Sequence, residues 1–136
     1  MTRTIATLFA TTATVLSIIG AAFAADLTET EIKALISNKT IYLQLAASAT
    51  GPAGQAKGYF ATDGVTLYKL PSGAILHGKW TTKGNQLCID WKESPNSPCV
   101  KYVKEGDKVT VHDAGTGKLQ ATIMKTAPGN AEKITP

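Results

Sequence analysis

The sequence predicts a mainly β protein, in which a short N-terminal helix is followed by an antiparallel meander of about eight strands with one disulfide bond. Three observations support this fold class. A helix-capping signal stands near residue 28, hydrophobic residues then alternate with period two, and Gly-, Asn- and Asp-containing turns separate the alternating runs. The chain has 136 residues, enough for a single domain with one modest core.

Residues 1–24 are predicted to be a signal peptide. Arg3 precedes a long uncharged run that ends at Phe23, and Ala22 and Ala24 supply the small residues that signal peptidase requires before its cleavage site. An uncleaved membrane anchor is the alternative, but the run is barely long enough to span a bilayer and an acidic stretch follows it. We therefore expect cleavage after Ala24, a periplasmic protein, and no membrane span in the exported part.

The exported part is mildly basic. Removing 24 of 136 residues leaves 112, and thirteen lysines against ten acidic residues give a net charge of +3. No arginine remains, whereas recognition of phosphates and base edges usually relies on the bidentate arginine fork. We therefore expect no nucleic-acid partner. We also expect a monomer.

We expect a single β domain over residues 25–125 and a flexible tail over residues 126–136. The tail contains two prolines, one glycine and few apolar residues, which is typical of a terminus that does not pack.

The expected helix begins at a capping box, Thr28-Glu-Thr-Glu31, in which the hydroxyl and the carboxylate each accept from a free backbone amide. Ile32, Leu35 and Ile36 follow as an apolar stripe, and Asn38 is a plausible stop. A helix of about three turns is too short to persist alone in water, so we expect its stripe to pack on the strands.

After the helix the pattern changes to short alternating runs. Hairpin turns are predicted where Gly, Asn or Asp can adopt positive φ, as in Thr62-Asp-Gly64 and Lys83-Gly-Asn85. The predicted strands are Thr40 to Leu45, Lys57 to Ala61, Val65 to Leu70, Ala74 to Thr81, Gln86 to Trp91, Cys99 to Lys104, Lys108 to Asp113 and Lys118 to Lys125.

The alternation also assigns a core face to the later strands. The expected core residues are Leu76, Gly78, Trp80, Leu87, Ile89, Trp91, Val100, Tyr102, Val109, Val111, Leu119, Ala121 and Ile123. Eight such strands predict a small lipocalin-like barrel or half-barrel, whose interior is either filled or has room for one small ligand. If a cavity exists, aromatic residues are candidates to line it: Tyr42, Tyr59, Phe60, Tyr68, Trp80, Trp91 and Tyr102.

Cys88 and Cys99 are the only cysteines, and an oxidising compartment favours a disulfide between them. The bond would lie on the face opposite Trp91 and constrain the loop from Lys92 to Pro98. Two cysteines alone do not make a structural zinc site, and they are not spaced as a C-x-x-C redox pair.

The sequence shows no catalytic motif, and we expect neither an enzyme nor a bound cofactor. Gly115-Thr-Gly-Lys118 resembles the end of a phosphate-binding loop, but Leu119 follows and a strand pattern continues, so a hairpin turn is expected. His77, His112 and Asp113 are weak metal-ligand candidates, because a metal needs three or four converging ligands and the sequence does not show convergence.

Two long loops, Ala46 to Ala56 and Lys92 to Pro98, are where a rigid barrel would present binding groups. Trp91, Lys92 and Glu93 at the base of the second loop are the candidate binding residues. The alternative is that both loops are tolerated insertions without a role.

Several motifs together resemble a group of small exported proteobacterial proteins of unknown function. They are the acidic helix start at Leu27 to Glu31, followed by Gly78-Lys-Trp80, Leu87-Cys88-Ile-Asp-Trp91, Cys99-Val-Lys-Tyr102 and Glu105-Gly-Asp107. The resemblance extends from about Leu27 to Ile123 and implies a β core without known catalytic residues. The G-x-W strand and single disulfide also resemble, more weakly, the periplasmic β-barrel inhibitors of secreted metalloproteases.

These observations predict a non-enzymatic periplasmic binding or accessory protein, whose partner is another protein or a small apolar ligand in the barrel mouth. The alternatives are an inhibitor of a secreted protease and a carrier of a small ligand or metal.

Overall fold

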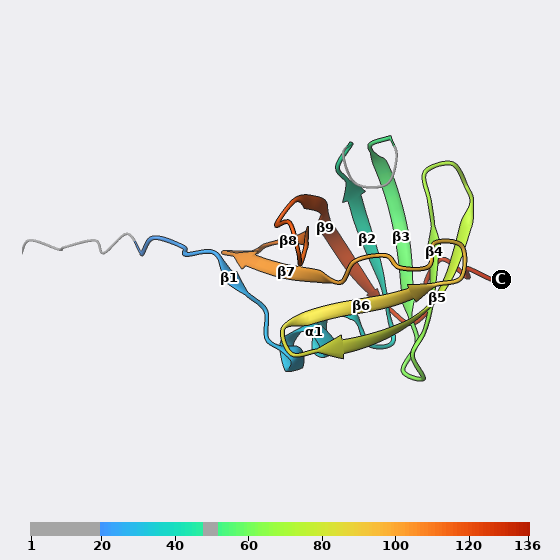
Figure 1. Ribbon diagram of the computed structural model, residues 1–136, viewed down its shortest axis with the longest axis horizontal. Coiled ribbons are helices and arrows are strands. Elements are labelled where there is room, and N and C mark those ends of the chain that lie inside the picture. The colour runs from blue at the N-terminus through green and yellow to red at the C-terminus, as the bar shows by residue number, and fades with distance from the viewer. Residues whose placement is uncertain (1–19, 48–51) are drawn as a thin grey trace, which may run out of the picture.

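The computed structural model describes residues 20–47 and 52–136, and in it the chain forms a closed eight-stranded antiparallel barrel with one extra strand and a short helix (Figure 1). This confirms the predicted fold class and decides for the barrel over the half-barrel. The elements are β1 (Ala25–Asp26), α1 (Glu29–Ile36), β2 (Lys39–Leu45), β3 (Gly54–Phe60), β4 (Val65–Lys69), β5 (Ile75–Lys83), β6 (Gln86–Trp91), β7 (Val100–Glu105), β8 (Lys108–Asp113) and β9 (Leu119–Pro128).

The barrel is closed by pairings between strands that are distant in sequence. From β2 to β8 each strand pairs with the next, and β9 pairs with both β8 and β2. The pairing of β6 with β7 is the sparsest in the barrel, since it consists of the single residue pair Leu87 and Val100. The disulfide between Cys88 and Cys99 lies directly beside this pair and links the two strands covalently, which confirms the predicted bond.

β1 lies against β7 on the same side as the sparse β6–β7 pairing. Ala25 and Asp26 pair with Lys104 and Val103, respectively. The Asp26 carboxylate accepts hydrogen bonds from the Asn85 amide at 3.0 Å and from the Lys101 ammonium at 3.1 Å. The segment before the helix thus bridges the β5–β6 turn and β7, an arrangement that the two-residue strand does not reveal in the sequence.

The helix packs over one end of the barrel. Its capping box forms as predicted, because the Thr28 hydroxyl accepts from the Glu31 amide and the Glu31 carboxylate accepts from the Thr28 amide. Ile32 and Ile36 are completely buried, and the helix contacts β2 and β5. Figure 1 shows α1 at the same end as the β3–β4 and β5–β6 turns. We call this end the helix end, and the opposite end, which carries the β2–β3, β4–β5, β6–β7 and β8–β9 connections, the loop end.

A column of aromatic side chains runs through the interior between these two ends. Trp80 contacts Phe60 with ring centroids 6.2 Å apart, Phe60 contacts Tyr68 at 5.8 Å, and Tyr68 contacts Trp91 at 5.1 Å, all edge to face. Edge-to-face contacts of this kind stabilise a core beyond their buried area. The Trp80 and Trp91 face is therefore the core face, as predicted.

The tail differs from the predicted flexible segment at 126–136. β9 continues to Pro128, and the buried Thr40 hydroxyl donates to the Gly129 carbonyl at 2.7 Å and accepts from the Ala131 amide at 3.0 Å. Ile134 is only 4% exposed. The tail is held because its backbone finds partners on β2, and such pairings leave no hydrophobic period in the sequence.

The predicted loop at 46–56 is shorter than expected, because β3 begins at Gly54 and pairs with the end of β2. Gly, Gln and Ala carry little strand propensity, so the sequence gives no signal for this extension. The rest of the loop includes residues 48–51, which lie outside the described residues, as does the predicted signal peptide except for its last five residues. Within the described part of the chain, no helix is long and apolar enough to cross a membrane.

Candidate functional site

A cavity of about 140 Å³ lies in the barrel interior at the loop end and is partly open to solvent. Its walls are mainly aliphatic and aromatic, and they come from seven of the eight barrel strands, from the start of the β4–β5 connection and from the end of the β6–β7 loop. The lining residues are Leu43, Leu45, Tyr68, Leu70, Leu76, Leu87, Ile89, Trp91, Pro98, Val100, Tyr102, Val111, Gln120 and Ala121. The interior is therefore filled at the helix end and left partly empty at the loop end.

Two glycines give the aromatic walls their position. Gly58 is the cross-strand partner of Tyr68, and a Cβ at Gly58 would lie 2.2 Å from the Tyr68 ring. Gly78 is the partner of Trp91, and a Cβ there would lie 2.9 Å from the Trp91 ring. Each ring therefore lies against a strand that has no side chain at that point, which is how glycine and an aromatic residue often pair across a sheet. The sequence places Gly78 on the core face, but it does not identify Gly58 as the partner of an aromatic ring.

Three polar side chains interrupt the apolar lining. The Tyr68 and Tyr102 hydroxyls make no hydrogen bond to any described residue, and the Gln120 amide lies nearby in the same wall. Burial raises the pKa of Tyr68, and burial followed by the proximity of Tyr68 raises the pKa of Tyr102 well above 10. Both phenols therefore stay protonated and can act as hydrogen-bond donors at any physiological pH.

Gln120 reaches the cavity because of a β-bulge. Thr110 and Val111 pair with Thr122 and Ala121, but the next residue of β8 pairs with Leu119, so Gln120 is left without an opposite residue. A bulge reorients side chains locally. This corrects the predicted alternation at this point, because Gln120 lines the cavity and Leu119 is 42% exposed.

The candidate binding residues from the sequence lie at the rim, and only one of them lines the cavity. Trp91 forms part of the wall. The Lys92 amide donates to the His77 carbonyl at 2.8 Å. The Glu93 carboxylate contacts His77 twice, with Oε1 at 2.5 Å from Nδ1 and Oε2 accepting from the backbone amide at 2.9 Å. Lys92 and Glu93 therefore attach the start of the β6–β7 loop to β5.

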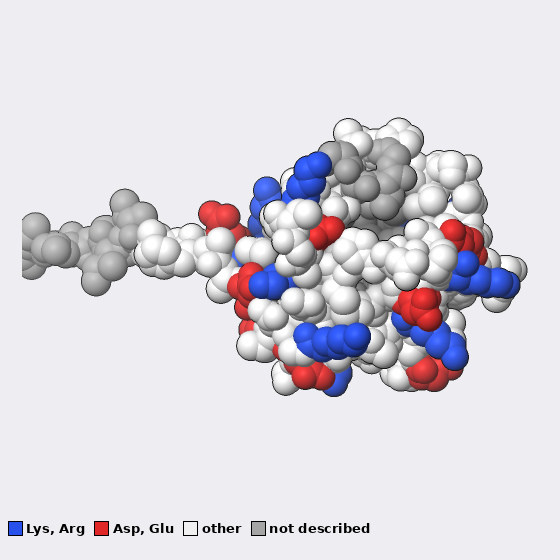
Figure 2. Space-filling view, viewed as in Figure 1, with Lys and Arg blue, Asp and Glu red and all other residues white. Residues whose placement is uncertain are grey.

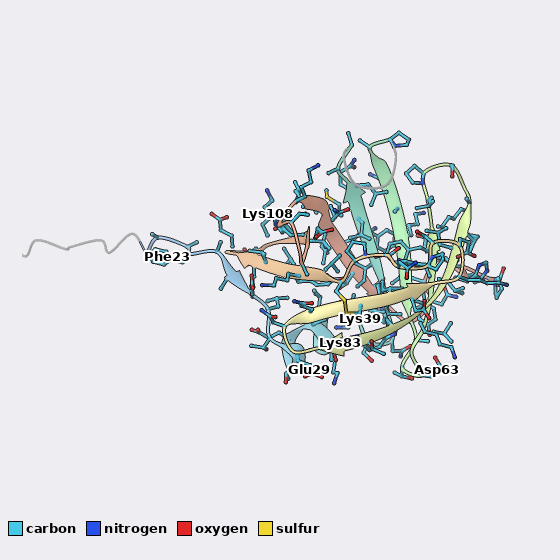
Figure 3. All side chains as sticks on the ribbon, in the orientation of Figure 1. Phe23, Glu29, Lys39, Asp63, Lys83 and Lys108 are labelled. Atoms are coloured by element: carbon cyan, nitrogen blue, oxygen red, sulfur yellow. A yellow bond between two sulfur atoms is a disulfide. The ribbon has the colours of Figure 1, made fainter. Side chains whose placement is uncertain are left out.

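Hydrogen bonds from His77 lower the pKa of Glu93, the side-chain bond contributing most and the backbone bond next. The carboxylate is thus ionised when it fixes the loop. Pro98, at the other end of the same loop, lines the cavity. The loop from residue 92 to residue 98 is consequently fixed to the barrel at both ends, by Glu93 at one and by the disulfide at the other. Figure 3 draws the described side chains on the ribbon, with the disulfide as a yellow bond.

The weak metal candidates are not brought together. His112 uses Nδ1 toward the Gly117 carbonyl at 3.1 Å and Nε2 toward the Thr110 hydroxyl at 2.8 Å. Asp113 accepts from the amides of Gly115 and Thr116, as a residue that shapes a turn does. Over residues 20–47 and 52–136, no three His, Cys, Asp or Glu side chains converge as a metal site would require.

On the visible face of the described part of the protein, no charge of one sign is concentrated (Figure 2). On the face shown in Figure 2, lysines and acidic residues are interspersed over the barrel and around the base of the N-terminal segment. Several are paired, including Lys57 with Glu132 at 2.9 Å and Lys33 with Glu29 at 2.6 Å. Such pairs between partly exposed side chains contribute little to stability, and they are typical of an ordinary solvated surface.

The seven aromatic candidates separate into three groups. Tyr68, Trp91 and Tyr102 line the cavity, Phe60 and Trp80 fill the core, and Tyr42 and Tyr59 bond outward to Glu132 and Asn38. The sequence identified the cavity aromatics but missed Gln120 and Gly58. The chain matches no family model, and neither a curated protein nor a solved structure matches it, so the resemblance drawn from its motifs stays a prediction.

Proposed function

We propose that this protein is a non-enzymatic binding protein of the periplasm, which holds a small, mainly apolar molecule in the cavity at the loop end of its barrel. The observation that carries the proposal is the cavity itself, about 140 Å³ of interior space behind mostly apolar walls. An apolar cavity of about 150 Å³ in another protein stays dry and binds benzene. The space here suits one small ring or a short branched chain.

The surroundings of the cavity favour a preformed site. Gly58 and Gly78 fix the Tyr68 and Trp91 rings, and the disulfide and Glu93 fix the loop that ends at Pro98. A rigid wall reduces the ordering cost of binding, because few side chains must be immobilised when the ligand enters. Concave, mainly apolar and largely preformed sites of this kind are typical of small-molecule binding.

The structure gives less support to the two other readings. A protease inhibitor that works through its N-terminal segment needs that segment to enter a cleft, but Asp26 is bonded to Asn85 and Lys101 and Leu27 donates to the Tyr102 carbonyl. A metal carrier needs converging ligands, and His112 and Asp113 use their polar atoms within their own hairpin. The apolar cavity therefore supports a ligand-binding function better than the other features support theirs.

Methylcyclohexane is a suitable first probe because it is apolar and close in size to the cavity. The protein, expressed as the full chain and purified in the form that cells accumulate, is titrated with it while amide and methyl shifts are followed by NMR. We expect saturable shifts at Leu87, Val111 and Ala121. Ala121→Leu, with Ala121→Val as a smaller step, fills the cavity and should weaken binding in order of added volume.

The matched control is Ala131→Leu, which adds the same atoms on the exposed tail. It should leave the affinity for methylcyclohexane unchanged. If the wild-type protein shows no saturable shift, or if Ala121→Leu binds as tightly as the wild-type protein, the cavity is not a ligand site and the proposal fails.

A further inference from the structure

The polar atoms that line the cavity indicate which chemical class of ligand would fit it. This inference rests on the proposed function, that the cavity binds a small molecule. Tyr102 is only 2% exposed and lines the cavity, yet its hydroxyl has no partner among the described residues. No side-chain nitrogen or oxygen in those residues is both sealed from solvent and unbonded. Because Tyr102 is almost completely buried and lines the cavity, we infer that its hydroxyl opens onto the cavity space. Tyr68, which is half-buried, lines the same cavity.

A hydroxyl donor in an apolar cavity is unfavourable unless a group in the cavity accepts its hydrogen bond. A buried hydroxyl without a hydrogen-bond partner reduces stability, because it has lost its hydrogen bonds to water. Two phenol donors face the same small space, and a carbonyl oxygen has two lone pairs that can accept from both. A ligand with one such oxygen would satisfy both hydroxyls at once, whereas a pure hydrocarbon would leave them unpaired.

The lining also excludes a charge. None of the described residues that line the cavity is Lys, Arg, His, Asp or Glu, so an anion or cation that entered would lose its hydration without gaining a counter-charge. Moving an ion into such surroundings is far more costly than moving a neutral polar group. The ligand is therefore neutral.

We propose that the cavity binds a neutral molecule of about one six-membered ring that carries a single carbonyl-type oxygen, which accepts hydrogen bonds from the Tyr68 and Tyr102 hydroxyls. The hydrocarbon part contacts the aliphatic walls and the Trp91 ring. Gln120, at the bulge, offers a further donor at the edge of the same space.

Three probes of similar shape test this class: cyclohexanone, methylcyclohexane and cyclohexanecarboxylate. Each probe is titrated into the protein, which is expressed as the full chain and purified in whatever processed form the cells contain. Binding is followed by calorimetry and NMR. Cyclohexanone is expected to bind about 3- to 10-fold more tightly than methylcyclohexane, which is about what one net hydrogen bond gives. The carboxylate is expected not to bind. The infrared carbonyl stretch of bound cyclohexanone should lie below its position in alkane solvent.

Two variants remove only the donors. Tyr102→Phe and Tyr68→Phe should each reduce the preference for cyclohexanone, and the double variant should abolish it while methylcyclohexane still binds. Neither single variant should lower the melting temperature, because the hydroxyl that is lost makes no hydrogen bond to any of the described residues. Tyr42→Phe, which removes a hydroxyl bonded to Glu132 on the exterior, is the matched control and should leave every affinity unchanged.

The outcomes separate the two proposals. If none of the three probes binds, the proposed function fails and this inference fails with it. If cyclohexanone and methylcyclohexane bind with equal affinity, or if the double variant keeps the preference, the cavity is an apolar site and only the carbonyl inference is overturned. Tighter binding of the carboxylate would also overturn it.

Discussion

The two ends of the barrel solve the same packing problem in different ways. At the helix end, α1 covers the opening, Ile32, Ile36 and Phe60 are fully buried, and the Trp80 ring nitrogen donates to the Ala61 carbonyl at 2.9 Å. At the loop end, none of the described elements covers the interior in this way, a cavity is present, and the Tyr68 and Tyr102 hydroxyls make no hydrogen bond to the described residues.

This difference indicates that the helix end stabilises the fold, while the loop end carries the candidate binding site. Complete packing and satisfied polar groups are what stabilise a small domain, and the helix end has both. Empty space and unpaired donors reduce stability, and proteins generally keep such features at functional sites. The aromatic column joins the two ends, so the filled half forms a rigid base for the open half.

The largest expected effect comes from truncating the filled end. Phe60→Ala removes a fully buried ring that contacts both Trp80 and Tyr68, and it should lower the free energy of unfolding by about 3–5 kcal/mol. Leu70→Ala, at the half-buried rim of the cavity, should cost only about 1 kcal/mol, because its side chain already borders empty space. Urea denaturation followed by tryptophan fluorescence measures both. Equal losses would mean that the two ends contribute alike.

The disulfide is expected to have the next largest effect. Cys88 and Cys99 are 11 residues apart, and opening a loop of this size should cost about 2–3 kcal/mol in the chain-entropy model. The double variant Cys88→Ala with Cys99→Ala should show this loss in urea denaturation. Amide exchange should rise first on β6 and β7, whose strands share one residue pair. A reducing agent should not change the double variant further, and uniform exchange over the whole barrel would contradict a local role.

The sequence predicts those structural features of the two ends that depend on residues close together in the chain. The capping box at Thr28 and the alternation that puts Trp80 and Trp91 inside are encoded within a few residues, and the structure has both. The disulfide follows from there being two cysteines in a chain predicted to be exported. Of these locally encoded features, the capping box and Trp80 belong to the filled end, whereas Trp91 and the disulfide belong to the open end.

The open end depends on interactions that cross between strands. Gln120 enters the cavity because a bulge shifts the register between β8 and β9, and alternation cannot show a bulge. Gly58 matters because its cross-strand partner is Tyr68, which is a property of the pairing of β3 and β4. The tail is held by Thr40, which is about ninety residues away in the chain. Sequence patterns predict which face of a strand is buried, but the cavity residues are brought together by the register in which neighbouring strands pair.

A smaller effect is expected at the helix that covers the filled end. Thr28→Ala removes one half of the capping box and should cost about 1 kcal/mol, because the Glu31 amide loses the hydroxyl that accepts its hydrogen bond. Thr28→Ser should restore most of this loss. Thr30→Ala, at an exposed position of the first turn, is the control and should be neutral. If Thr30→Ala lowers the free energy of unfolding as much as Thr28→Ala does, the loss of the helix cap is not the cause of the destabilisation.

The smallest expected effect concerns the loop at the open end and depends on pH. The hydrogen bonds from His77 lower the pKa of Glu93 below its ordinary value of 4.5. A carboxyl group whose pKa is lower in the folded state stabilises that state above the unfolded pKa, and this contribution disappears as pH falls through the folded pKa. The attachment of the loop to β5 should therefore be complete at neutral pH and should weaken only below about pH 4.5.

The His77 amide reports this attachment, because it donates directly to the Glu93 carboxylate. In the wild-type protein its hydrogen exchange should be slow at neutral pH, and its NMR shift should change as the solution is acidified below pH 4.5. Glu93→Gln should exchange faster at neutral pH and show no such titration, while the global melting temperature changes little because the pair lies at the surface. Glu105→Gln, an exposed control on β7, should behave as the wild-type protein. If the amide shift of His77 changes below pH 4.5 in Glu93→Gln as it does in the wild-type protein, another group attaches the loop to β5. The order of the loop would then depend on the disulfide and Pro98.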